Sequence, residues 1–283
     1  MTISGQAKIA GIMGHPVGHS RSPRLHNYWL KHHGIDGAYV PFDVAPENLE
    51  TAMRALPVLG LRGVNLTIPH KENVMPFLDE IDPVARRLGA VNTVVARPDG
   101  SLWGTSTDGA GFVDSLLAEF PGFDFGSAAV LVLGAGGAAR AIIGALLDRN
   151  TPEIRIHNRT ETRIAQIIAD LGKGLFAGRL MAANDPAAAM DQVQLVINTT
   201  SQGMQGMPPL DIDLHYLPED ALVADIVYAP LETRLLKSAR MRGNPTLSGI
   251  GMLVYQARAG FHHWFGYQPD VTPDLIKLMT ADL

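Results

Sequence analysis

The 283-residue sequence predicts an α/β fold divided into two domains. Short apolar runs of β type alternate with longer helical stretches along the chain, which is the pattern of a sheet covered by helices. The length corresponds to about two domains of roughly 150 residues each. Apolar residues make up 46% of the chain and charged residues 18%, so there is enough apolar material for two buried cores.

The first half of the chain begins with a strand and continues with alternating elements. Strands are expected at Lys8–Met13, Ala38–Asp43, Gly63–Leu66, Thr93–Ala96 and Leu102–Thr105. Helices are expected at Pro23–Lys31, Pro46–Leu56 and Pro83–Leu88. Asp99-Gly100 is a turn dipeptide, so the last two strands form a hairpin.

The second half begins with a helix, Gly109–Phe120, and again alternates. Its strands are expected at Ala129–Leu133, Glu153–His157, Leu195–Asn198 and Leu222–Ile226. Its helices are expected at Ala138–Asp148, Glu161–Leu171, Thr233–Met241 and Met252–Phe265. The last helix is amphipathic, with Leu253, Ala257, Phe261 and Trp264 on one face. Domain boundaries near Thr107–Gly109 and Ser248–Gly251 assign residues 1–107 and 249–283 to one domain and 108–248 to the other.

Composition excludes several classes of protein. Lys and Arg number 23 against 28 Asp and Glu, a net charge of −5, so a nucleic-acid partner is not expected. Cysteine is absent, which excludes disulfides, thiolate nucleophiles and cysteine-based metal sites. His15 and His19 are four residues apart, but Pro16 and Gly18 argue against a helical ligand pair, and no metal site is expected.

One stretch is long enough to span a bilayer. Ala128–Leu147 contains a single charged residue, Arg140, but it also contains four glycines, and its residue pattern changes halfway along. The first 13 residues hold one lysine and no sustained apolar run, so they are not expected to be a secretory signal. A cytoplasmic protein without a membrane segment is therefore predicted.

A glycine-rich loop follows the apolar strand that ends at Leu133. Its residues are Gly134, Ala135, Gly136, Gly137 and Ala138, followed by Ala139, which fits G-x-G-x-x-A between a strand and a helix. Gly134 permits the turn, Gly136 lets the backbone approach a pyrophosphate, and the helix N-terminus attracts its charge. The alternative is that the glycines only pack the sheet.

The next strand ends in Asn158, Arg159 and Thr160, with Arg163 one helical turn later. An acidic residue here would bind the ribose 2′-hydroxyl of NAD, whereas arginine suits a 2′-phosphate. The sequence therefore favours NADP as the cofactor. The alternative is a solvated arginine at the start of a helix.

Small polar residues recur where the strands of the first half end. They are Ser20, Ser22, Asn65, Thr67, Lys71, Asn92 and Asp108. Singly each has an ordinary explanation: a serine or Asp108 caps a helix, Asn92 caps a turn and Lys71 is a surface charge. Together they offer a polyhydroxylated acid several hydrogen-bond partners and one Lys/Asp pair.

These stretches resemble the shikimate dehydrogenase family along nearly the whole chain. The matching blocks are Gly14-x-Pro16-x-x-His19-Ser20-x-Ser22-Pro23-x-x-His26-Asn27, Asn65-x-Thr67-x-Pro69-x-Lys71, Ala90-Val91-Asn92-Thr93, Thr107-Asp108-Gly109, Gly134–Arg140, Asn158-Arg159-Thr160, Asn198-Thr199-Thr200-x-x-Gly203-Met204, Asp225-x-x-Tyr228-x-Pro230-x-x-Thr233 and Gly251-Met252-Leu253-Val254-x-Gln256-Ala257. Nine ordered blocks are far more specific than any one of them.

The resemblance implies an NADP-dependent oxidoreductase that reduces 3-dehydroshikimate to shikimate in aromatic amino-acid biosynthesis. It implies an N-terminal α/β substrate domain, a Rossmann-type NADP-binding domain and C-terminal helices that return to the substrate domain. By the same resemblance Lys71 and Asp108 are the catalytic pair. The carried-over substrate residues are Ser20 and Ser22 for the carboxylate, and Asn65, Thr67, Asn92, Asp108 and Gln256 for the ring hydroxyls. Tyr228 and Met252 would lie where substrate meets nicotinamide, and Thr199 and Gly249 near the cofactor.

One departure from the family pattern is Ser106, which stands where the family usually has Asn before Thr-Asp. It removes an amide close to Asp108. The residue before Gly249 is Ser248, where an acidic or amide residue is frequent, a milder change.

Two alternative functions remain open from the sequence. One is a relative that acts on quinate or another cyclohexane carboxylate, because an extra hydroxyl needs only small changes in a site. The other is an NADP-binding sensor without turnover, against which the retained Lys71 and Asp108 argue. Monomer and homodimer are equally compatible with the sequence.

Overall fold

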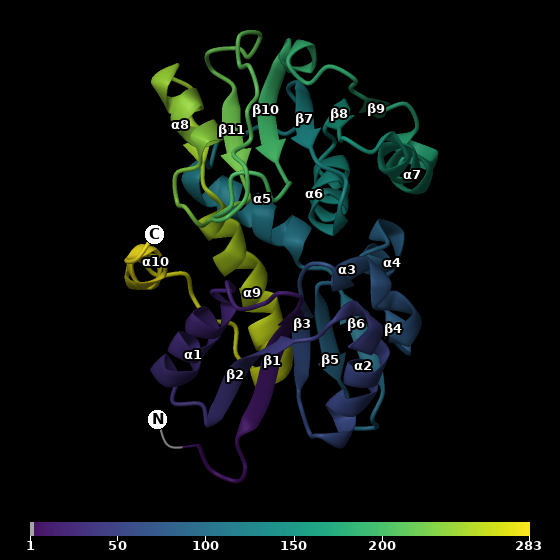
Figure 1. Ribbon diagram of the computed structural model, residues 1–283, viewed down its shortest axis with the longest axis vertical. Coiled ribbons are helices and arrows are strands. Elements are labelled where there is room, and N and C mark those ends of the chain that lie inside the picture. The colour runs from purple at the N-terminus through teal and green to yellow at the C-terminus, as the bar shows by residue number, and fades with distance from the viewer. Residues whose placement is uncertain (1–2) are drawn as a thin grey trace. The chain divides into compact units, whose positions relative to one another are not determined.

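The computed structural model describes residues 3–283, which form two compact units. The first unit contains residues up to Asp108 together with Val254–Met279, and the second contains Gly109–Leu253 and the last four residues. Figure 1 labels their helices and strands.

The first unit is built on a six-stranded mixed sheet with the order β2-β1-β3-β5-β6-β4. Its strands are β1 (Lys8–Gly14), β2 (Gly37–Asp43), β3 (Gly63–Leu66), β4 (Glu80–Ile81), β5 (Thr93–Ala96) and β6 (Leu102–Thr105). β1 is parallel to β2 and β3, whereas β5 is antiparallel to β3 and β6. The carboxyl ends of β3 and β6 therefore meet the amino end of β5.

Helices pack on both faces of this sheet. They are α1 (Ser22–His32), α2 (Leu49–Val58), α3 (His70–Asn73), α4 (Pro83–Leu88), α10 (Pro273–Thr280) and the part of α9 (Gly249–Phe265) from Val254 onward. Val64 and Leu66 of β3 pack in one core with Met53 and Leu56 of α2. Because side chains alternate along a strand, Asn65 between them faces the opposite side, toward α9.

The second unit is built on a six-stranded sheet with the order β12-β11-β10-β7-β8-β9, and its strand pairs are parallel. Its strands are β7 (Ala129–Leu133), β8 (Ile154–His157), β9 (Leu180–Ala182), β10 (Val193–Asn198), β11 (Leu222–Asp225) and β12 (Thr246–Leu247). Numbered from β7, this order is 3-2-1-4-5-6, which is the doubly wound dinucleotide-binding arrangement.

The helices of the second unit are α5 (Asp108–Glu119), α6 (Gly137–Asp148), α7 (Glu161–Leu171), α8 (Arg234–Met241) and the start of α9. Leu131 of β7, Val196 of β10 and Val223 of β11 pack with Leu235 of α8 in one core. The stretch Ala128–Leu147 is a strand, a loop and a helix. Among residues 3–283, none of the helices is long and apolar enough to cross a membrane.

Two predicted helix starts are wrong. The expected helix Pro46–Leu56 is a 3-10 turn at Pro46–Asn48 followed by α2, because Asn48 (φ −99°, ψ 0°) is not helical. The helix expected at Met252–Phe265 is α9, and it begins at Gly249 rather than at Met252. A Cβ on Gly249 would lie 2.2 Å from the carbonyl oxygen of Ile226, and one on Gly251 would lie 2.0 Å from Oγ of Ser115. These glycines weaken the helix signal but are required by close packing.

Several short elements were not predicted. They are β4, β9, β12, α3, α10 and the 3-10 turns Met75–Phe77, Gly174–Phe176 and Ala188–Met190. Most have two to four residues, too few for a periodic pattern to appear.

Candidate functional site

Lys71 and Asp108 form an ion pair in the first unit. Nζ of Lys71 lies 2.6 Å from Oδ2 of Asp108, and only 18% and 6% of the two side chains are exposed. Lys71 is held by the single turn α3, whose carbonyl at this residue accepts from the Val91 N–H at 2.8 Å. Asp108 is the first residue of α5. A shielded ammonium beside a carboxylate forms a pair that can give or take one proton.

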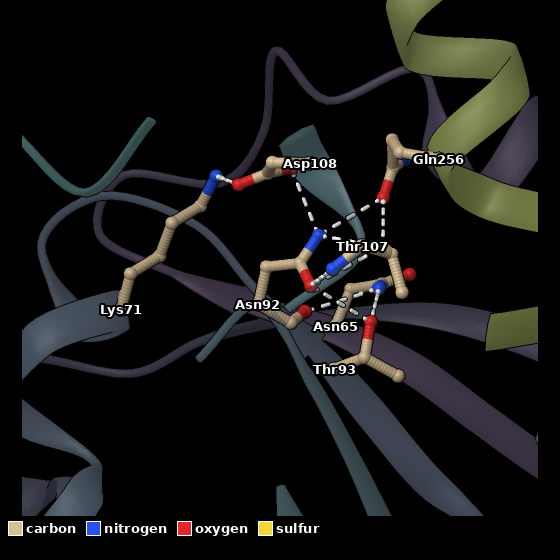
Figure 2. Close-up of polar contacts among 7 residues, drawn as sticks. All are labelled: Asn65, Lys71, Asn92, Thr93, Thr107, Asp108 and Gln256. Carbon is tan, nitrogen blue, oxygen red and sulfur yellow. Dashed lines mark hydrogen bonds and ion pairs between the residues drawn. The ribbon is translucent and has the colours of Figure 1, made fainter. Parts of the chain in front are cut away.

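Asn92, directly before β5, is the centre of the surrounding polar cluster (Figure 2). Its Nδ2 lies 2.8 Å from Oδ1 of Asp108, 2.9 Å from Oγ1 of Thr107 and 3.2 Å from Oε1 of Gln256. Its Oδ1 accepts from the Thr107 N–H at 2.8 Å and from the Thr93 hydroxyl at 3.1 Å. The amide therefore holds one oxygen of the Asp108 carboxylate while Lys71 holds the other.

Asn65 extends this cluster toward β2. Its Nδ2 donates to the carbonyl oxygen of Asn92 and to Oγ1 of Thr93, each at 3.1 Å, and its Oδ1 accepts from the phenol of Tyr39 at 2.6 Å. The buried line Tyr39–Asn65–Thr93 therefore joins β2 to the polar cluster.

The two predicted carboxylate-binding serines stand at the start of α1. Arg21 is the N-cap of this helix and makes no capping hydrogen bond with its side chain, so neither serine occupies the cap position. Ser20 is half-buried, and its Oγ accepts from the Ser22 N–H at 3.3 Å. Ser22 is buried.

The remaining residues predicted near the substrate are Thr67, Tyr228, Gly249 and Met252. Thr67 lies half-buried just past β3, and its methyl group lies against Gly14, where an added Cβ would come within 2.3 Å of it. Tyr228, Gly249 and Met252 belong to the second unit.

A cluster of aromatic side chains packs against Tyr39. The imidazole of His26 stacks on its ring with centroids 4.0 Å apart and planes within 8°, and Trp29 and Phe261 close around the imidazole. Among residues 3–283, neither ring nitrogen of His26 has a hydrogen-bond partner. Burial lowers the pKa of His26 to about 3 and raises that of Tyr39 well above its usual range. Both groups are therefore neutral at physiological pH.

The predicted glycine loop lies between β7 and α6 in the second unit. Gly134 has φ +114°, and a Cβ there would lie 2.4 Å from Oγ1 of Thr199, which itself donates to the Leu133 carbonyl at 2.7 Å. Gly136 is the N-cap of α6 and has no atom within 4 Å of an added Cβ. The loop thus leaves open backbone at a helix N-terminus, a fit for a pyrophosphate.

The residues after β8 suit a phosphate beside the ribose. Asn158 bends the chain by donating from Nδ2 to the Thr160 carbonyl at 3.0 Å, while Arg159, Thr160 and Arg163 are exposed. Within the described part of the chain, the guanidinium groups of Arg159 and Arg163 make no ion pair. The positive charges of these two guanidinium groups are therefore available to bind an anion.

Asp225 was named in the sequence only as part of a family block and was given no role, although it is buried and bonded to three groups of the second unit. Its carboxylate accepts from Asn198 Nδ2 at 2.9 Å, the Val227 N–H at 3.0 Å and the Thr233 hydroxyl at 2.7 Å. Burial raises its pKa to about 6 despite these donors. The group joins the carboxyl ends of β10 and β11 to the N-cap of α8.

Residues 3–283 contain no group of three or more His, Asp or Glu side chains placed to hold a metal ion.

Comparison with known proteins points to one family. The shikimate dehydrogenase substrate binding domain model matches residues 12–94, and the shikimate / quinate 5-dehydrogenase model matches residues 117–205. The chain is 50% identical to shikimate dehydrogenase (NADP(+)) of Paramagnetospirillum magneticum over 273 residues, which are 96% of this chain and 98% of that relative.

Solved structures are similar over almost the full length. Shikimate 5-dehydrogenase of Thermus thermophilus, in complex with NADP(H) and shikimate, has a TM-score of 0.85 and 34% identity, covering 97% of this chain and 98% of that one. Quinate dehydrogenase of Corynebacterium glutamicum, in complex with NAD, has a TM-score of 0.88 and 29% identity, covering 97% and 99%.

Proposed function

The chain belongs to the shikimate dehydrogenase family, and from this premise we propose that it interconverts 3-dehydroshikimate and shikimate with NADP as cofactor. The observation that carries the proposal is the shielded Lys71–Asp108 pair inside a cluster of neutral amides and hydroxyls. We assign the first unit to substrate binding and the second to NADP binding.

The Lys71–Asp108 pair donates and accepts the proton that the reaction transfers. The glycine loop after β7 would hold NADPH, which would supply a hydride to the carbonyl carbon, so that negative charge would grow on the carbonyl oxygen. The pair delivers one proton to that oxygen, and it removes the proton from the hydroxyl in the reverse direction. Asn92 holds the carboxylate of Asp108 toward Lys71 throughout.

Neutral polar groups recognise the rest of the substrate. Ser20 and Ser22 bind the carboxylate, and Asn65, Thr67, Asn92 and Gln256 surround the ring hydroxyls. Tyr228 and Met252 contact the substrate beside the nicotinamide. Such a set of uncharged hydrogen-bond partners discriminates hydroxyl positions because a hydroxyl at another position would be buried without a partner.

The second unit holds the cofactor. The backbone of Gly134, Ala135, Gly136, Gly137 and Ala138 binds the pyrophosphate, with Thr199 and Gly249 nearby. Asn158, Arg159, Thr160 and Arg163 surround the 2′-phosphate, where an arginine forms charge-assisted hydrogen bonds. The enzyme acts on a small molecule in the cytoplasm, as a monomer or a homodimer.

One assay tests this function against the quinate alternative. The purified protein is incubated with shikimate or quinate and with NADP or NAD, and reduced cofactor is followed by its absorbance. We expect shikimate with NADP to give the highest kcat/KM. Faster turnover with quinate would reassign the substrate, and cofactor binding without turnover of either acid would indicate a sensor.

A further inference from the structure

Asp225 is a buried carboxylate of the second unit that the proposed mechanism does not use. It is the last residue of β11, and only 2% of it is exposed. Its Oδ1 accepts from Nδ2 of Asn198 at 2.9 Å and from the Val227 N–H at 3.0 Å. Its Oδ2 accepts from the Thr233 hydroxyl at 2.7 Å. Each of these hydrogen-bond donors is electrically neutral.

The negative charge of Asp225 is not compensated by a positive side chain. Among residues 3–283, no Lys, Arg or His forms an ion pair with it. Glu232 and Arg234, on either side of the N-cap of α8, are exposed and pair with Arg240 and Asp211 instead. Burial raises the pKa of Asp225 to about 6, so the carboxylate is ionised above that pH. The field of such a charge is weakly screened and reaches neighbouring groups.

The strand order places Asp225 in the half of the second unit that is left for the nicotinamide. In the order 3-2-1-4-5-6, the two halves of the sheet each bind one nucleotide beyond the carboxyl ends of their strands. The first half, β7 to β9, has the Gly134 loop and Arg159, which we assign to the pyrophosphate and the 2′-phosphate. The nicotinamide end of NADP therefore belongs to β10, β11 and β12, and Asp225 ends the middle strand of these three.

Asp225 also adjoins residues that we assign to the cofactor. Ile226, Gly249 and Met252 line one small cavity together with Asp225. A Cβ on Gly249 would lie 2.2 Å from the carbonyl oxygen of Ile226, so the backbone next to Asp225 packs directly on Gly249. Asp114 of α5 is exposed. The other residues that line the cavity are uncharged: Phe112, Ser115, Ala224, Leu247 and Ser248.

The ionised carboxylate lowers the stability of the folded protein, because burial favours the uncharged form. Asparagine has nearly the same shape and is able to make the same contacts. Its oxygen accepts from Asn198 and Val227, and its amide donates to the hydroxyl oxygen of Thr233. A buried charge at a position where a neutral side chain fits is typical of functional sites.

Oxidised and reduced NADP differ in the charge of the nicotinamide. The oxidised ring is positive and the reduced ring is neutral, whereas the pyrophosphate and the 2′-phosphate are the same in both. The Gly134 loop and Arg159 therefore contribute equally to the binding of the two forms. A negative charge in the nicotinamide half attracts only the oxidised form.

We propose that Asp225 is a specificity-determining residue that strengthens the binding of NADP⁺ relative to that of NADPH. Its carboxylate attracts the positive nicotinamide through the electrostatic field and not through a direct contact. The same attraction stabilises the positive charge that develops on the nicotinamide during hydride transfer to the substrate. This inference rests on the proposed function, because it takes the second unit as the NADP-binding unit.

Equilibrium binding to the purified protein without substrate tests the inference. The dissociation constants of NADP⁺ and NADPH are measured by fluorescence titration for wild type and for Asp225→Asn. The two pH values are 5 and 8, on either side of the Asp225 pKa of about 6. The quantity compared is the NADPH constant divided by the NADP⁺ constant, because titration of the shared phosphates cancels in this ratio. At pH 8 we expect the ratio to be at least about fivefold larger in wild type than in Asp225→Asn, and at pH 5 we expect agreement within about twofold.

The matched control is Asp220→Asn, the same loss of charge at an exposed residue shortly before β11. It should leave the ratio unchanged, and an equal effect of the two changes overturns the inference. A merely structural role of Asp225 weakens both forms of the cofactor alike, so an unchanged ratio in Asp225→Asn also overturns it. If that variant fails to fold, a wild-type ratio that is the same at pH 5 and pH 8 overturns it too. A wild-type protein that binds neither form refutes the proposed function instead.

Discussion

Asn92 donates from Nδ2 to Oδ1 of Asp108 over 2.8 Å, so one amide fixes the orientation of the carboxylate. The other oxygen of Asp108 is thereby directed at Lys71, 2.6 Å away. The geometry of the proton-transfer pair thus depends on a residue that has no proton to transfer.

Replacing Lys71 with Ala should remove the proton donor while leaving the recognition amides in place. We expect kcat to fall by about 10²–10⁴-fold, with a much smaller change in KM for shikimate, because the ammonium matters most as charge develops. Steady-state kinetics on Lys71→Ala and on the exposed Lys31→Ala as control measure this. A change confined to KM would remove Lys71 from the chemistry.

Asn92→Leu should affect both stability and catalysis. The change leaves the Thr107 N–H and one oxygen of Asp108 without their partner, at about 1–3 kcal/mol for each buried group. We expect the free energy of unfolding to drop by about 2–4 kcal/mol and kcat to fall more than about tenfold. Denaturant unfolding and kinetics are compared with the exposed Asn48→Leu, and equal effects of the two changes would refute the bracing role of Asn92.

Arg159→Ala should weaken NADP selectively. The cofactor loop binds the pyrophosphate that NAD and NADP share, so only the residues after β8 can distinguish them. We expect kcat/KM for NADP to fall by the equivalent of about 2–4 kcal/mol with little change for NAD, less if Arg163 shares the phosphate. Arg149→Ala, at the far end of α6, is the control. Equal losses for both cofactors would contradict the assignment.

His26 should make the protein less stable in mild acid. Its folded pKa of about 3 lies below the ordinary value of 6.5, so the unfolded chain binds more protons between these values. The free energy of unfolding should fall, from this group, by about 1.4 kcal/mol for each pH unit below 6.5. His26→Phe should abolish this slope. Parallel stability curves for the two proteins between pH 3 and 6.5, the window that these values set, would show that His26 is not buried and neutral.

Asp225 should have the opposite pH dependence. Its folded pKa of about 6 lies above the ordinary 3.8, so its contribution is largest below pH 3.8 and is lost as the pH rises through 6. The stability of wild type relative to Asp225→Asn should therefore fall by about 3 kcal/mol between pH 4 and 7. Unfolding curves across this range measure the difference, and a difference that does not change with pH would be inconsistent with a buried carboxylate.

Elements with a clear period or turn signal were predicted accurately. The hairpin strands Thr93–Ala96 and Leu102–Thr105 and the loop after Leu133 are as the sequence indicates, since alternation, Asp99-Gly100 and the glycine spacing are local signals. The short β12 and the single turn α3 have no such signal in the sequence. They form because of contacts with distant parts of the chain, such as the pairing of β12 with β11.

The contacts within the site follow from tertiary pairing. Tyr39 reads in the sequence as an ordinary strand residue, and it reaches Asn65 only because β2 and β3 flank β1 in register. Asp225 and Asn198 are 27 residues apart and meet because β10 and β11 are adjacent. The residue types in the sequence identify the candidate site residues, whereas the register of the strands determines which of these residues are in contact.

The divided first unit imposes an order on folding during synthesis. The indole of Trp264 donates to the Val94 carbonyl, 170 residues earlier in the chain, and Gln256 bonds Asn92 across 164 residues. The ribosome must release almost the entire polypeptide before these partners meet, whereas Gly109–Leu253 is continuous. The aromatic surface that α9 covers in the folded protein therefore stays exposed while the rest of the chain is synthesised. Chaperone binding protects the nascent N-terminal segment most during this period.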